Sequence, residues 1–230
     1  MWTNPSKRLT PSVYHAKQMI CRLKEGRGVV LFCDLHGHSR KHNIFCYGCE
    51  VKGQPIERLA ERIFPFMLGR AANVFAFRDC SFRIQRQKES TARVVVFREM
   101  KIANAFTLEA SFAGANFGKE SGRHFTPKHL REIGHCFCDC ILDYQDPNTR
   151  AEVHNTLLAL YPEGVMATEG GDTGGSDDNP SEDCADPLLI ERQIAKKKRL
   201  STRETLRRPQ KCFWTAPTGR QERKPPPPHP

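Results

Sequence analysis

The stretch that decides the fold is VVLFCDLHGH, residues 29–38. Its first half, Val29 to Cys33, is a continuous apolar run of strand length, which is typical of a buried strand in a sheet covered on both faces. Its second half is polar and contains Asp34, His36 and His38. In open α/β sheets the ligand site lies beyond the carboxyl ends of the strands. The stretch therefore predicts a buried strand that runs into a candidate site.

Helix-like and strand-like segments alternate around this strand. Apolar residues recur at helical spacing in residues 12–24, 55–69, 126–144 and 148–160. Strand-like runs occupy residues 81–85, 92–98 and 105–112, and the second of these is β-branched and aromatic. Thr126 and Pro127 are suited to the N-cap and first position of a helix, whereas Pro65 is expected to kink one. The alternation predicts an α/β domain.

Composition divides the chain into two parts. Hydrophobic residues make up 38% of the 230 residues, which is low for a fully globular chain. Residues 163–230 are first rich in Gly, Ser and acid, then basic and proline-rich, and cannot bury enough surface to offset their ordering entropy. We expect a folded domain over residues 1–162 and a disordered tail over 163–230.

Charge and apolar runs bound the class of protein. The net charge is +10, and residues 1–164 hold 24 basic and 16 acidic side chains, which suits an anionic partner. The sequence contains no run of about 18 apolar residues, so it predicts no membrane-spanning helix. The N-terminus lacks the apolar core of a signal peptide, and ten cysteines in an unsignalled chain are expected to be reduced. We therefore expect a cytoplasmic protein without a membrane partner.

Two polar features are candidates for chemistry. The Asp-x-His-x-His at residues 34–38 has the ligand types that zinc prefers, although a polar loop with solvated histidines is an alternative. Glu109 lies in the middle of the apolar run 106–112. Burial raises the pKa of a carboxylate, which suits a general base. Alternatively, Glu109 faces water from an alternating strand.

Three ordered motifs resemble those of one family. DLHGHSRKHNIF (34–45), TARVVVFR (91–98) and FTLEASF (106–112) look like the cytosolic carboxypeptidases, and WTNPS (2–6) looks like the segment that leads into their Asp-Leu-His strand. These enzymes are zinc metallocarboxypeptidases that resemble the pancreatic digestive enzymes in fold. They shorten glutamate-rich tails, notably those of tubulin. The resemblance covers residues 2–147 and implies a mixed sheet flanked by helices.

The resemblance also implies roles for individual residues. His36 matches the third zinc ligand, and Glu109 matches the catalytic glutamate that activates water. Arg93 matches a basic position that meets the acidic side chain of the departing glutamate, since a guanidinium pairs bidentately with a carboxylate. Alternatively, Arg93 is a charge on an edge strand. The expected cofactor is Zn²⁺ and the expected partners are acidic, tubulin-like C-terminal tails.

Three further basic residues are secondary candidates. Arg40, Lys41 and Arg98 add positive field for an anionic tail, or else they are solvated surface charges. Nucleic acid is not an expected partner. Lys196–Arg199 is a candidate for a nuclear import signal or a microtubule-binding patch, with a solvated run in a disordered tail as the alternative.

One departure from the family has consequences for activity. A zinc site needs at least three protein ligands. The family takes the first two from an upstream His-x-x-Glu and clamps substrate with an Asn-Arg pair, and both are expected before Trp2. His129 and Glu132 form a His-x-x-Glu in the wrong order. We expect the carboxyl-terminal half of a catalytic domain, arising as a truncated gene model, a splice product or a decayed paralogue. Alone it should bind zinc weakly and not hydrolyse peptides.

Two more expectations follow from the cysteines and from the incomplete sheet. The Cys-x-x-Cys at residues 46–49 and the thiols at 136, 138 and 140 are interpreted as buried small hydrophobes rather than a zinc module. A sheet cut at its middle exposes an unpaired edge that invites association. A non-enzymatic alternative is a basic protein that docks acidic tails without cutting them.

Overall fold

The computed structural model describes residues 1–50 and 58–162 of this chain. The expected tail over residues 163–230, with Lys196–Arg199 in it, lies outside the described residues and stays a prediction. Within the two described ranges, no helix is both long enough and apolar enough to cross a membrane.

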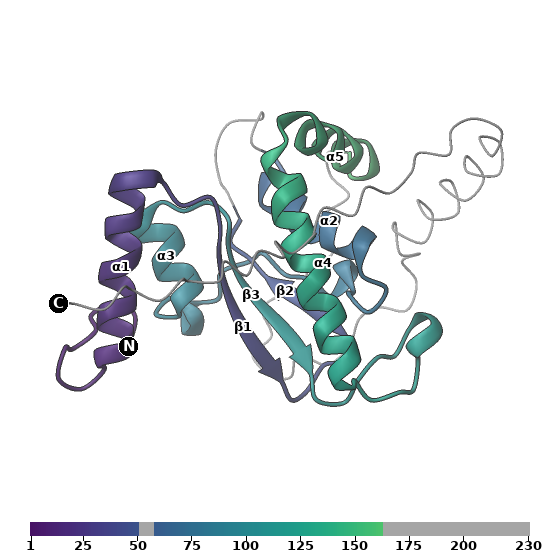
Figure 1. Cartoon of the computed structure of the whole chain (residues 1–230), viewed down its shortest axis with the longest axis horizontal. Helices are drawn as coiled ribbons and strands as arrows, with labels where there is room; N and C mark the ends of the chain where they lie inside the picture. Colours follow the sequence, from purple (N-terminus) through teal and green to yellow (C-terminus); the bar gives the residue numbers. More distant parts are fainter. Residues whose placement is uncertain (51–57, 163–230) are drawn as a thin grey trace, which may run out of the picture. The chain divides into compact units, whose positions relative to one another are not determined.

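A three-stranded mixed sheet forms the centre of the described structure (Figure 1). β1 (Phe32–His38) and β3 (Ala105–Ser111) are parallel, and β2 (Ile44–Tyr47) pairs with the other side of β3 in the antiparallel sense. The spatial order β1-β3-β2 places β1 at an edge. The sheet thus matches the mixed topology that we expected.

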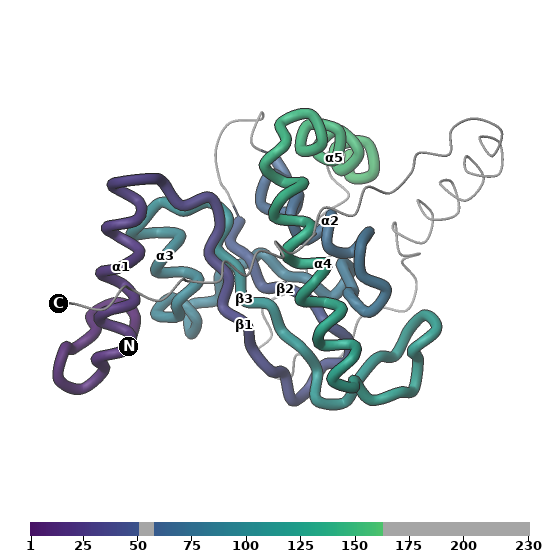
Figure 2. The backbone as a smooth tube through the Cα atoms, viewed as in Figure 1, coloured from purple at the N-terminus to yellow at the C-terminus, as the bar shows by residue number. Residues whose placement is uncertain are grey.

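Helices cover both faces of this sheet (Figures 1 and 2). Their bounds are α1 (Pro11–Arg27), α2 (Ile63–Ala71), α3 (Ala92–Met100), α4 (Pro127–Gln145) and α5 (Pro147–Leu160). One core joins Phe106 and Leu108 of β3 to α2, α4 and α5. A smaller core joins Phe32 and Ala105 to α1 and α3. Because successive strand residues face opposite ways, these two cores lie on opposite faces of the sheet.

The strand predicted over residues 92–98 is wrong, because this segment is the helix α3. Its three valines favoured a strand by propensity, but in the helix they are buried between their neighbours, and tertiary burial overrides weak propensity. The expected strand at 81–85 is reduced to one isolated bridge, between Ser81 and Tyr47. β2 was not predicted, since its four residues directly follow a polar loop and are too short to show a period.

The helix ends follow local sequence signals in part. Thr126 precedes α4 as its N-cap, and its backbone N–H donates to Nδ1 of His129 at 3.1 Å. This contact gives the imidazole of His129 a capping role. Pro65 lies in the first turn of α2, which begins at Ile63, and a first-turn position needs no N–H from a proline.

Candidate active site

One face of the sheet gathers the polar residues. In the pairing of β1 with β3, His36 lies opposite Glu109 and Asp34 lies opposite Thr107. In the pairing of β2 with β3, Phe45 lies opposite Glu109. Residues opposite one another across a ladder point to the same face. One side of the sheet therefore carries the carboxylates of Asp34 and Glu109, the imidazole of His36, and the rings of Phe45 and Tyr47, which we call the aromatic floor.

Glu109 is buried and lacks a complete set of hydrogen bonds. Only 7% of the residue is exposed, and its buried Oε2 has no hydrogen-bond partner among the described residues. Burial raises the pKa of the carboxyl above its ordinary value, while the nearby His36 acts in the opposite direction. The alternative in which Glu109 faces water is excluded. An under-coordinated buried carboxylate can accept a proton from a bound molecule.

His36 lies beside an acidic neighbour on its own strand. Its Nδ1 is 3.6 Å from Oδ2 of Asp34, and its side chain is 59% exposed. This distance is too long for a hydrogen bond, so Asp34 acts on the imidazole as a nearby charge. The exposed imidazole is accessible to a metal or a ligand.

Arg93 lies on α3 rather than on a strand, which corrects the strand expected at residues 92–98, but its side chain lies near the strand pair, beside Tyr47 of β2. The residue is 5% exposed, its guanidinium carbon is 5.5 Å from the centroid of the Tyr47 ring, and its Nε and Nη1 have no hydrogen-bond partner among the described residues. Burial lowers the pKa of the guanidinium, whereas the nearby Cys49, Tyr47 and Glu109 raise it. A buried cation with free donors is suited to an anionic ligand.

Lys41 is a second cation on this face, and we placed it only among the secondary candidates. Its Nζ is 5.3 Å from the ring centroid of Phe45 and 5.7 Å from that of Tyr47. His38 shapes the loop that carries it, because Nδ1 of His38 accepts the backbone N–H groups of Arg40 and Lys41 at 3.2 and 3.0 Å. The only sequence signal for Lys41 was its place in the polar run after β1.

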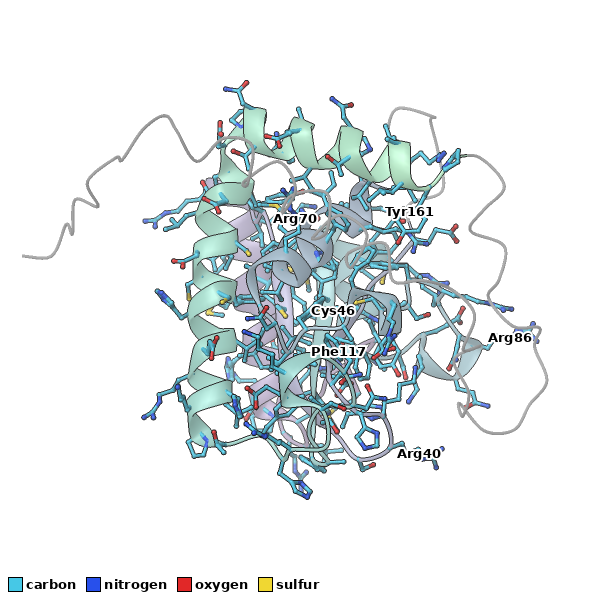
Figure 3. The ribbon with its side chains drawn as sticks, turned by 90° about the vertical axis from the view of Figure 1, so that its right-hand side faces the viewer. Arg40, Cys46, Arg70, Arg86, Phe117 and Tyr161 are labelled. Atoms are coloured by element: carbon cyan, nitrogen blue, oxygen red, sulfur yellow. The ribbon has the colours of Figure 1, made fainter. Side chains whose placement is uncertain are left out.

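The other two predicted substrate residues lie farther from the buried group. Arg40 is exposed and points away from the molecule (Figure 3). Arg98, near the end of α3, forms an ion pair of 3.0 Å with Glu89, and its side chain is 48% exposed. Neither has a described contact with Glu109 or Arg93, so for both the structure favours a solvated surface charge.

The thiols follow the prediction in part. Cys46 lies in the interior, and its backbone N–H donates to Sγ of Cys80 at 3.2 Å (Figure 3). Burial raises the pKa of Cys49 to about 11 and that of Cys80 to about 12. Cys138, however, is exposed, because three thiols two residues apart on a helix point in different directions. That part of the prediction is wrong.

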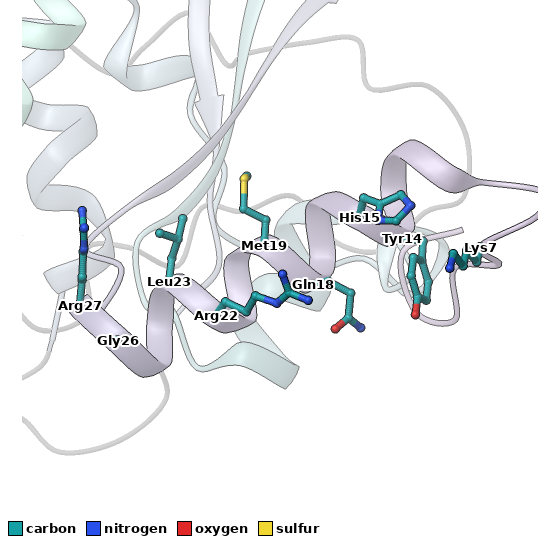
Figure 4. Close-up of a pocket in the computed structure, with 9 residues that line it drawn as sticks. All are labelled: Lys7, Tyr14, His15, Gln18, Met19, Arg22, Leu23, Gly26 and Arg27. Atoms are coloured by element: carbon teal, nitrogen blue, oxygen red, sulfur yellow. The ribbon is translucent and has the colours of Figure 1, made fainter.

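A recess on the outer side of α1 is separate from these residues. Its volume is about 510 Å³, and Met19, Arg22 and Leu23, which are three and four residues apart on α1, all line it (Figure 4). None of the residues that line it belongs to the polar sheet face. The candidate site therefore rests on the sheet rather than on this recess.

The described residues fit a metal ion only in part. In residues 1–50 and 58–162, no group of three His, Cys, Asp or Glu side chains could hold one. His36 offers one imidazole, whereas a zinc site takes at least three protein ligands. His129 and Glu132 do not add to it, since His129 caps α4 and Glu132 is exposed. The described residues therefore supply one imidazole of the three or more ligands that a zinc site takes.

Comparison with known proteins places this face in a family context. Cytosolic carboxypeptidase 3 of Mus musculus is 46% identical over 163 residues, which cover 69% of this chain and 16% of the relative. Cytosolic carboxypeptidase 2 of Macaca fascicularis is 35% identical over 226 residues, covering 85% of this chain and 27% of the relative. The structure of a metallo-carboxypeptidase from Pseudomonas aeruginosa, in complex with (2-guanidinoethylmercapto)succinic acid, aligns with a TM-score of 0.52 at 25% identity. No protein-family model matches the chain.

These likenesses confirm two expectations. The curated homologues are cytosolic carboxypeptidases, as the three motifs indicated, and the mixed sheet flanked by helices is shared with a metallo-carboxypeptidase. The chain spans between 14% and 27% of the length of the curated relatives it matches. The structural match covers 63% of this chain and 38% of the other. The described residues thus correspond to part of a catalytic domain.

Proposed function

Because this chain is homologous to part of the cytosolic carboxypeptidases, we propose that it contributes to a zinc-dependent metallocarboxypeptidase that removes C-terminal glutamate-type residues from acidic tails such as those of tubulin. The observation that carries the proposal is the buried guanidinium of Arg93, which has two nitrogens without hydrogen-bond partners on the same side of the sheet as Glu109. The names of the relatives support a cytoplasmic location.

Each residue of the face has a proposed part. Arg93 pairs with the side-chain carboxylate of the terminal glutamate, and Lys41 extends the positive field across the aromatic floor of Phe45 and Tyr47. Glu109 accepts a proton from the attacking water, for which its raised pKa is suitable. His36 is the one ligand for Zn²⁺ that these residues offer, and the carboxylate of Asp34 acts on it as a nearby charge.

Peptide hydrolysis tests this proposal. The full chain is co-expressed with mouse Cytosolic carboxypeptidase 3 from which the stretch matching this chain has been deleted, the mixture is incubated with zinc and with peptides that end in three glutamates or three glutamines, and released amino acid is measured by mass spectrometry. Glutamate-selective release that Glu109→Gln abolishes supports the proposal. Arg93→Met should remove the selectivity, whereas Arg98→Met, on the same helix but exposed and paired with Glu89, should keep it. Release that is indifferent to both Glu109→Gln and Arg93→Met contradicts it.

A non-catalytic binding function is the second candidate. The incomplete ligand set of the described face favours it, as does the excess of positive charge in residues 1–164. It predicts that the chain binds the glutamate peptide without cutting it, that binding weakens as salt rises, and that Glu109→Gln does not affect binding. Fluorescence anisotropy of a labelled peptide at two ionic strengths measures this. Stoichiometric zinc and Glu109-dependent turnover by the chain alone would contradict it.

A further inference from the structure

The outer side of α1 combines a recess with exposed apolar side chains (Figure 4). Met19 is 56% exposed and Leu23 is 42% exposed, and both line the recess of about 510 Å³. The two residues are four apart and so lie one turn from each other on the helix, whereas Ile20 belongs to the core that α1 shares with α3. Large apolar side chains that remain exposed in a hollow of the surface mark an interaction site.

The charges around these apolar side chains have one sign. Lys7, Arg22 and Arg27 line the recess, and none of its lining residues is acidic. None of these three side chains has an ion pair or a hydrogen bond with another described residue. Three cations without counter-charges produce a positive potential, which favours an anionic occupant. The recess therefore fits a segment that combines acidic with apolar side chains.

One segment of this chain has that composition. Residues 165–187 contain seven acidic residues and no Lys or Arg, and the apolar residues 188–190 follow directly. We call residues 165–190 the acidic run, which lies outside the described residues. Its charge is opposite to that of the recess, and its apolar end matches Met19 and Leu23.

A short connection joins the acidic run to the described domain. α5 ends at Leu160, five residues before the acidic run begins. From residue 160 to residue 187 the chain can span at most about 90 Å, whereas a folded domain of about 160 residues has a radius of gyration of about 15 Å. The recess is thus within reach, and the tether raises the local concentration of the acidic run to the order of millimolar. A contact too weak to form between separate molecules is then populated.

We propose that the recess on α1 binds the acidic run of the same chain, with carboxylates on its three cations and the apolar end over its two apolar side chains. The contact regulates access to the recess: while it holds, the recess is closed to any other acidic peptide, and an increase in salt opens it. The inference does not depend on the proposed peptidase function, since neither Arg93 nor Glu109 lines the recess.

Carbodiimide cross-linking of the full chain tests the inference. The reagent joins a carboxylate to a lysine amine, with loss of water, where the two are in contact, and peptide mass mapping identifies the pair. We expect the acidic run to be joined to Lys7 at least about threefold more than to Lys24, which lies on α1 but outside the recess. The product should run as a monomer, and about 0.5 M salt should remove most of it.

Matched double variants separate the recess from the overall charge. Arg22→Gln together with Arg27→Gln should lower the Lys7 product about twofold or more, because the recess loses two cations. Arg86→Gln together with Arg131→Gln removes the same charge from exposed residues outside the recess, and should change the Lys7 product by less than about 20%. All four residues are exposed, so the circular dichroism spectrum should stay that of the wild type.

The inference is overturned if the folded chain gives no Lys7 product, or if Lys7 and Lys24 react equally. Equal effects of the two double variants would also overturn it. A product that runs as a dimer would show that a second copy is the occupant. A labelled glutamate peptide that joins to Lys7 where the acidic run does not would show that the recess serves an external partner. Failure of the glutamate peptide to be cut would contradict the proposed function and leave this inference standing.

Discussion

Replacing Arg93 with methionine should stabilise the folded protein. Only 5% of the surface of Arg93 is exposed, and the Nε and Nη1 atoms of its guanidinium have no hydrogen-bond partner among the described residues. Methionine is similar in length and has no polar group to desolvate. A residue retained at the expense of stability is expected where it binds a ligand.

The size of the gain can be worked from the two unpaired groups. Each buried donor without a partner costs about 1–3 kcal/mol. The attraction between the guanidinium and the Tyr47 ring, 5.5 Å from its centroid, returns at most about 2 kcal/mol when desolvated. The net expectation for Arg93→Met is therefore a gain of about 2 kcal/mol, which for a protein of this size raises the midpoint of thermal unfolding by about 4–8 °C.

Urea unfolding followed by circular dichroism measures this gain on the full chain. Arg98→Met is the matched control on the same helix, because Arg98 is half exposed and its ion pair with Glu89 is at the surface. That control should change the free energy of unfolding by less than about 0.5 kcal/mol. If Arg93→Met lowers the free energy of unfolding by about 1 kcal/mol or more, the guanidinium stabilises the fold. That result would refute the proposal that Arg93 is kept to bind a ligand.

Three further predictions concern the carboxylate, two glycines and one thiol. Burial raises the pKa of Glu109 in the folded state, so the folded protein loses stability as the pH rises above the pKa that Glu109 has in the unfolded chain. The Glu109→Gln variant should therefore be more stable than wild type at about pH 7.5 and should lose this advantage toward about pH 4. Urea unfolding of both proteins in the presence of a chelator measures the difference. Gly48→Ala should cost about 1–3 kcal/mol, because its Cβ would lie 2.4 Å from the buried Phe82 ring, whereas Gly37→Ala meets only an exposed ring and should cost less in the same assay. Cys138 should be the first of the described thiols to react with a maleimide, as peptide mass mapping will show; faster labelling of a buried thiol would contradict this.

The elements that could be predicted are those with a long period or a clear cap. α1 and α5 have apolar residues at helical spacing, and the start of α4 follows from Thr126 and Pro127. α3 could not be assigned correctly, because nine residues with three adjacent valines satisfy a strand by propensity and a helix by burial. Only the packing of α3 against β1 and β3 decides between them.

A site residue could be predicted where its polarity differs from that of the apolar residues around it in the sequence. A glutamate in an apolar run and a histidine after one were recognisable, and the register now places His36 opposite Glu109. Lys41 was harder to single out, because its approach to Phe45 and Tyr47 depends on β2, a strand too short to be seen in the sequence. Side chains brought together by strand pairing leave no spacing signal along the chain.

The edge position of β1 links the fold to the chemistry of the site. A strand at a sheet edge is normally protected by charge, by a bulge or by a covering segment. β1 instead carries ionisable groups on one face and an exposed apolar strip on the other. β1 is paired with β3 on one side, and its two faces differ in chemistry: Asp34 and His36 share the face on which Glu109 lies, whereas Leu35 lies exposed on the other. A substitution at Leu35 should therefore leave the polar face unchanged, and one at His36 should leave the apolar face unchanged.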